Sequence, residues 1–410
     1  VVEIANEPNP RWKLLQQIWA VFALVLFIVT FRLWLPANDF PAIPLFTAFA
    51  SPVFQSGWTH YPLLALCGVS LLASIIKPHP RLWLLILSSL VLMFLLNQHH
   101  LQPWAFHLGL GATVFATCSA NDGARLLRVL CISIYVFSAV GKFDYQFIYT
   151  VGQQFLNAAV RLVGQNTDAL SPELGAKLTL VFPAFELLVG ILLSFTKTRK
   201  IGIIAAVILH INIILILSPL GLGHKPGVII WNGLFIALIP ILFVIRSKFP
   251  VKIKLSSGSR IAWWVIMAAS LLPISEPFGK YDHWLAWGLY SPRTSRVEIN
   301  IHSYKVGELS ELEPYLLPPS GKTPFRELDI RKWSLAELHV PIYPQDRFQL
   351  AVARYLAHRY KLESGIEVHL MGIADRFTGK RDIEILRGTR EVDMRCQRFL
   401  FSTDSFNAAN

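Results

Sequence analysis

Long apolar runs dominate this chain and limit what it can fold into. Nine of them, each bounded by charges, Pro or Gly, follow one another in the first 290 residues, near 16–35, 61–76, 81–97, 102–119, 125–141, 174–196, 201–219, 228–245 and 261–275. A helix needs about 20 mainly apolar residues to cross the hydrocarbon core of a bilayer. The sequence therefore predicts a mainly α-helical fold, a polytopic transmembrane bundle of about nine helices, whose shorter members are candidates for partial or re-entrant segments.

The distribution of charge supports this interpretation and excludes other classes of protein. Residues 1–290 hold 20 of the 38 Lys and Arg but only 10 of the 26 Asp and Glu. Because these bases flank apolar runs instead of forming a stripe across a folded surface, nucleic-acid binding is not indicated. The four cysteines include no CxxC pair, so neither a metal site nor a dithiol redox centre is indicated.

Lys and Arg in the connections predict the orientation in the membrane. Five lie on one side and fourteen on the side of the N-terminus: Arg11, Lys13, Lys77, Arg81, Arg125, Arg128, Lys197, Arg199, Lys200, Arg246, Lys248, Lys252, Lys254 and Arg260. Connections rich in Lys and Arg face the cytoplasm. We therefore expect a cytoplasmic N-terminus in a bacterial inner membrane or similar. Nine crossings would then place the C-terminal domain in the periplasm or a lumen.

Two segments do not follow the transmembrane pattern. Residues 143–171 predict an amphipathic helix at the outer interface, because apolar residues recur every three to four positions: Phe147, Val151, Phe155, Ala158 and Leu162. Residues 291–410 predict a small α+β domain outside the membrane. Apolar residues alternate in 297–301 and 366–370 as in half-buried strands, helical spacing covers 346–360, and 375–381 predict a charged turn. The predicted domains are thus 1–290 and 291–410.

Ionisable side chains within apolar runs are the candidate functional groups, because lipid strongly disfavours them unless protein shelters them. Five residues qualify: His107, Lys142, Glu186, His210 and His224. Lys142 ends a predicted helix, so it either reaches to the interface beside Asp144 or turns inward as a base. Glu186 and His210 each lie ~15 Å from the basic turn at 196–200, at 1.5 Å rise per residue. A carboxylate–imidazole pair is therefore a hypothesis, in either a structural or a proton-handling role.

The Gly-rich and Pro-rich segment 221–227 predicts an outer loop that carries His224 and leads into the next helix. Trp231 follows as a candidate interface anchor, and Asn232 needs a hydrogen-bond partner inside the bundle. We group His224, Trp231 and Asn232 as candidate ligand-binding residues.

Two blocks resemble the HTTM group, the transmembrane core of the vitamin K-dependent γ-carboxylase superfamily. The first, Tyr135–Asp144 with the sequence YVFSAVGKFD, is similar to the family's segment with a catalytic lysine. The second runs from Phe185-Glu186 through the basic turn to His210 and resembles a helix pair with an acidic residue and a histidine. The resemblance covers residues 100–245 and implies that Lys142 is a base and the cofactor a quinone. It differs in having Gly141 before the lysine and a much smaller external domain, so peptide γ-carboxylation is not expected to transfer.

Two functions remain as alternatives. In the first, the chain is a quinone-linked membrane enzyme in which Lys142 takes or delivers a proton, while Glu186 and His210 hold helices or relay protons. In the second, it is a non-catalytic subunit of a larger complex, whose helices pack on other membrane subunits and whose C-terminal domain docks a soluble partner. A transporter is less favoured because the sequence has no evident internal repeat.

Overall fold

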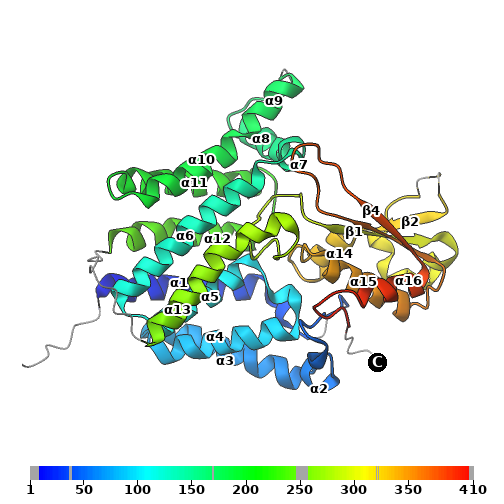
Figure 1. Cartoon of the computed structure of the whole chain (residues 1–410), viewed down its shortest axis with the longest axis horizontal. Coiled ribbons are helices and arrows are strands. Elements are labelled where there is room, and N and C mark those ends of the chain that lie inside the picture. The colour runs from blue at the N-terminus through cyan, green and yellow to red at the C-terminus, as the bar shows by residue number, and fades with distance from the viewer. Residues whose placement is uncertain are drawn as a thin grey trace, which may run out of the picture. The chain divides into compact units, whose positions relative to one another are not determined.

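The computed structural model describes residues 9–36, 39–168, 170–245, 257–319, 321 and 323–405. The chain divides into two compact units. The helical unit comprises Val1–Val29, Ala65–Leu90 and Pro103–Pro292. The mixed unit comprises Thr30–Leu64, Val91–Gln102 and Arg293–Asn410, so the C-terminal tail folds together with two segments from the first quarter of the chain. Figure 1 shows the elements of both units.

Seven helical stretches among the described residues are long and apolar enough to cross a membrane, and they mark the chain as an integral membrane protein. They are α1 (Pro10–Val29), α3 (Gly57–Ile76), α6 (Ala120–Lys142), the stretch Pro172–Ser194 that contains α9 (Pro172–Thr179) and α10 (Val181–Ser194), α11 (Arg199–Leu217), α12 (Pro226–Val244), and the stretch Gly258–Phe278 that begins in α13 (Ser257–Leu271).

The other two predicted runs are helices as well, but shorter ones. α4 (Pro80–Leu96) has 17 residues and α5 (Pro103–Thr117) has 15. Nearly all of α5 is buried, as expected of a core helix surrounded by others. Every apolar run of the sequence is thus helical. The predicted connection with Arg246, Lys248, Lys252 and Lys254 lies outside the described residues.

The predicted amphipathic segment contains α7 (Tyr145–Tyr149) and α8 (Val151–Leu162). Asp144 caps α7 by accepting the backbone N–H of Phe147 at 3.0 Å. Phe147, Phe155 and Ala158 are buried as the periodicity predicts, whereas Leu162 at the helix end is exposed. Phe155 and Ala158 pack on Ile216 and Leu217 of α11, which attaches α8 to the bundle.

Close helix packing positions the interior of the helical unit. α6 packs against α10 and α13, and α12 packs against α11 and α1. A Cβ at Gly190 of α10 would lie only 3.2 Å from Cβ of Tyr135 on α6, and one at Gly202 of α11 would lie 2.8 Å from the backbone of Leu193. Glycine is therefore needed at Gly202 for α10 and α11 to approach this closely, and at Gly190 it gives α6 and α10 a contact tighter than most side chains make.

The mixed unit contains a four-stranded antiparallel sheet in the order β2-β1-β3-β4. Both predicted strands are confirmed as β1 (Arg296–His302) and β3 (Ile366–Met371), and the predicted helix as α15 (Asp346–Arg359). The C-terminal part of the unit also contains β2 (Phe325–Leu328), β4 (Ile383–Arg387), α14 (Ile330–Glu337) and α16 (Gly388–Cys396). The charged turn is confirmed too, because Asp375 accepts hydrogen bonds from Phe377 and Thr378.

Candidate functional site

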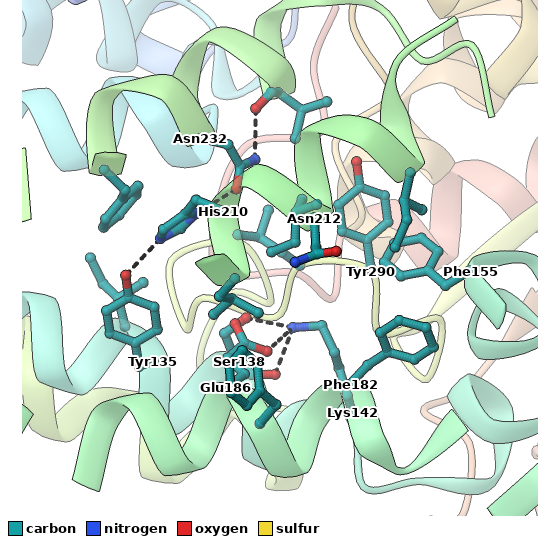
Figure 2. Close-up of a pocket in the computed structure, with 18 of the residues that line it drawn as sticks. Tyr135, Ser138, Lys142, Phe155, Phe182, Glu186, His210, Asn212, Asn232 and Tyr290 are labelled. Atoms are coloured by element: carbon teal, nitrogen blue, oxygen red, sulfur yellow. Dashed lines mark hydrogen bonds and ion pairs between the residues drawn. The ribbon is translucent and has the colours of Figure 1, made fainter. Parts of the chain in front are cut away.

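A cavity of about 250 Å³ lies inside the helical unit. Its walls come from α6, α7, α8, α10, α11 and α12 and from the turn at Leu289 and Tyr290 (Figure 2). Most of the lining is aliphatic or aromatic. The polar lining residues are Tyr135, Ser138, Lys142, Glu186, His210, Asn212, Trp231, Asn232 and Tyr290. A mainly apolar pocket with a few converging polar groups is the usual form of a small-molecule site.

Lys142 is buried and turned toward the cavity, which is the inward orientation of the two that the sequence allowed. Its Nζ donates to Oε2 of Glu186 at 2.7 Å, to Oγ of Ser138 at 2.6 Å and to the carbonyl oxygen of Ser138 at 3.0 Å. Ser138 lies one helical turn before Lys142 on α6, so the two side chains share a face. Each of the three ammonium protons thus has an acceptor.

Glu186 comes from α10, one turn before the close contact at Gly190. This packing brings its carboxylate to Lys142 as an ion pair. The hypothesis that Glu186 pairs with His210 is therefore wrong. Both ring nitrogens of His210 already have partners, Tyr135 and Asn232, and Glu186 faces α6 instead of α11.

His210 is the centre of a second hydrogen-bonded group. Asn232 donates from Nδ2 to the carbonyl oxygen of Val228 at 2.8 Å, which turns its amide oxygen toward Nδ1 of His210 at 2.7 Å. Nδ1 then carries the proton and donates. Because a buried imidazolium would be costly, we assign the neutral ring, in which Nε2 accepts from the hydroxyl of Tyr135 at 2.6 Å. The imidazole is neutral in this arrangement. His210 is also the hydrogen-bond partner that Asn232 was expected to need.

Trp231 also lines the cavity, and its Nε1 donates to Nδ1 of His107 at 3.3 Å. His224 lies in the loop before α12 and does not line the cavity. Its Nδ1 is hydrogen-bonded to the hydroxyl of Tyr290 at 3.2 Å, and Tyr290 does line the cavity. Burial raises the pKa of Tyr290 and lowers that of His224, so this bond joins two neutral groups near neutral pH.

The most exposed lining residues show where the cavity opens. Val181 of α10 and Asn212 of α11 both line it and are both exposed. Both helices also carry exposed apolar side chains near these positions, Leu188 two turns from Val181 on α10 and Ile208 and Ile211 within about one turn of Asn212 on α11. The opening is thus bordered by apolar surface of two membrane-spanning helices, the kind of surface that faces lipid.

Four of the polar lining residues were not singled out from the sequence. Tyr135 and Ser138 precede Lys142 by seven and four positions, and helical spacing could have placed them on its face. Asn212 is a polar residue within an apolar membrane-spanning helix, and such residues are candidate functional groups. Tyr290 is remote in sequence and adopts a left-handed φ of 60°, and no local pattern predicts it.

No group of three His, Cys, Asp or Glu within the described ranges could hold a metal ion. The site instead offers an ion pair, a neutral imidazole and a phenol to one apolar chamber. These groups can bind a polar headgroup and exchange a proton with it. Searches of protein-family models, of characterised proteins and of solved structures find no match to this chain.

Proposed function

We propose that this protein binds a lipid-soluble ligand of the quinone class in the cavity, and that Lys142 and Glu186 exchange a proton with its headgroup. The ion pair carries the proposal. Two opposite charges are held at 2.7 Å in the wall of a mainly apolar chamber, where an ordinary structural contact would be served as well by apolar side chains. The HTTM-like blocks of the sequence favour the same cofactor class.

Different parts of the lining would hold the ring and tail of the ligand, admit it from the lipid and bind its headgroup. The aromatic and aliphatic wall, which includes Phe155, Phe182 and Phe235, suits a planar ring and an isoprenoid tail. The opening beside Val181 and Asn212 suits entry from the lipid. A quinol headgroup would supply hydroxyl groups that can lose a proton. Lys142 would donate a hydrogen bond to its oxygen and stabilise negative charge there, while Glu186 holds the proton that leaves.

The second polar group would orient the headgroup. Tyr135 is seven residues from Lys142, on the same face of α6, and bonds to the neutral His210 that Asn232 holds in one tautomer. Its phenolic oxygen can accept a hydrogen bond from a bound headgroup without any change of charge. We therefore assign Tyr135 and His210 a positioning role.

We further propose nine crossings, a cytoplasmic N-terminus and an outer C-terminal domain. The structure's short connections support this plan. Lys77 lies between α3 and α4, and Lys197 lies between α10 and α11. Each is a connection of three or four residues that joins two apolar helices and carries a lysine, as expected of a cytoplasmic loop.

Quinone binding to the purified protein in lipid nanodiscs tests the proposal. A short-chain quinone is titrated while the fluorescence of the tryptophans, which include Trp231 in the cavity wall, is followed. A hydrogen bond to a charged group contributes about 1.5–3 kcal/mol, so K142M should weaken binding by roughly ten- to a hundredfold. The matched control is K177M, at an exposed position of α9 away from the cavity. Equal affinities of the two variants would contradict the proposal.

A further inference from the structure

A continuous stripe of exposed apolar side chains runs along α3. Its members recur every three to five residues from one end of the helix to the other: Trp58, Tyr61, Leu66, Val69, Leu72 and Ile76. A membrane-spanning helix with such a stripe presents it to lipid. Trp58 is 91% exposed at the first turn, where aromatic residues of membrane helices usually meet the interface.

The apolar surface does not stop where α3 begins. Phe46, Val53 and Phe54, which precede the helix, are exposed as well. Residues 40–76 include no Asp, Glu, Lys or Arg, although only 57–76 belong to the spanning helix. A charge-free segment with exposed aromatic rings is unusual on a surface that faces water.

Hydrogen bonds hold this segment in place. Gln55 lies in the short helix α2 (Pro52–Gln55) and is buried. Its Nε2 donates to the carbonyl oxygens of Phe49 at 3.0 Å and Leu96 at 2.9 Å. The exposed rings therefore project from a fixed backbone and are not the result of a loose loop.

The end of the chain adds a second apolar element to the same surface. The backbone N–H of Ser402 donates to the carbonyl oxygen of Leu45 at 3.1 Å, and the ring of Phe401 lies 5.8 Å from that of Phe46. Gln98 donates to the carbonyl oxygen of Ser402 at 2.8 Å and fixes the strap 399–404 from inside. Leu400, next to these anchored residues, is 90% exposed.

We propose that Phe46, Val53, Phe54, Trp58 and Leu400 form a lipid-inserted surface that docks the mixed unit on the bilayer at the outer end of α3. The occupant is lipid because the surface continues the stripe of α3 without a break and carries no charged residue between Phe40 and Ile76. Amphipathic elements of this kind sink roughly 5–10 Å into the boundary between headgroups and acyl chains.

A fluorescent probe on single cysteines tests the proposal in the full-length protein reconstituted into liposomes. The background carries Cys118→Ser, because the other three cysteines are buried. Bimane is attached to V53C, W58C or L400C. The matched control is F377C, because Phe377 is also an apolar residue of the mixed unit, 83% exposed, but sits in the turn with Arg376, Lys380 and Arg381.

Each probe is quenched either by iodide in water or by phosphatidylcholine with a doxyl group high on its acyl chain. We expect the doxyl lipid to quench the probe at 53, 58 and 400 and iodide to quench it several-fold less there than at 377. Iodide quenching equal to that of the control would overturn the proposal. Protection from both quenchers would also overturn it, because that result would indicate a protein partner or a second copy of the chain. If the doxyl lipid quenches the probe at position 58 but not at position 400, that result would overturn the assignment of segment 399–404 to this surface.

Discussion

Removing one member of the Lys142–Glu186 pair should destabilise the protein strongly. The two side chains are only 8% and 13% exposed, and they lie in the mainly apolar wall of the cavity. In K142M the Glu186 carboxylate loses its counter-charge in that environment. Breaking a buried pair in this way lowers the free energy of unfolding by about 3–5 kcal/mol. We expect K142M and E186M each to lose stability in this range.

The double variant separates pairing from packing. K142M/E186M replaces both charges with unbranched apolar chains, and such replacements are neutral or stabilising in other proteins. Its free energy of unfolding should lie close to that of the unsubstituted protein, which makes the coupling energy several kcal/mol. Denaturation in detergent micelles, with K177M as the exposed control, measures all four proteins. Strictly additive losses in the double variant would refute the reasoning, because they would mean that the charges do not stabilise each other.

Three further predictions follow from other groups. Y135F removes the hydrogen bond to Nε2 of His210 and should lower the free energy of unfolding by about 1–3 kcal/mol in the same assay; no loss would argue against the assigned tautomer. Burial raises the pKa of Cys396 to about 11, so this thiol should react with maleimide at mildly alkaline pH far more slowly in the folded protein than after unfolding, as mass spectrometry can measure. Burial alone would raise the pKa of Asp393, but hydrogen bonds from His358 and Arg354 hold it below its ordinary value. Its stabilising effect is therefore present above about pH 4 and is lost as the pH falls through the lowered value. The protection of α16 amides against hydrogen exchange, corrected for the intrinsic exchange rate at each pH, should therefore fall in acid, and less so in R354M.

The sequence predicted the helices well because lipid requires long apolar runs, and all nine runs are helical. The rule that ionisable groups do not belong in lipid also selected Lys142, Glu186 and His210, which all line one cavity. In the mixed unit, alternation predicted β1 and β3 because each has one buried face. β2 has four residues and β4 buries only one, so neither carries an alternating signal.

The pairing of the site residues could not be predicted from the sequence. Glu186 meets Lys142 and not His210 because Gly190 lets α10 pack closely on α6, and sequence alone does not give that rotation. Tyr290 enters the cavity wall from a turn with a left-handed backbone, a conformation that its residue type does not predict. The partners of a buried charge therefore depend on tertiary contacts, whereas its position within a helix follows from local sequence.

An experimental density map of the protein in lipid nanodiscs, recorded with added short-chain quinol, tests the central claim most directly. We predict planar density in the cavity, with a polar atom within hydrogen-bond distance of Nζ of Lys142 or the carboxylate of Glu186. An empty cavity, or density for an acyl chain with no polar atom near the ion pair, would contradict the account.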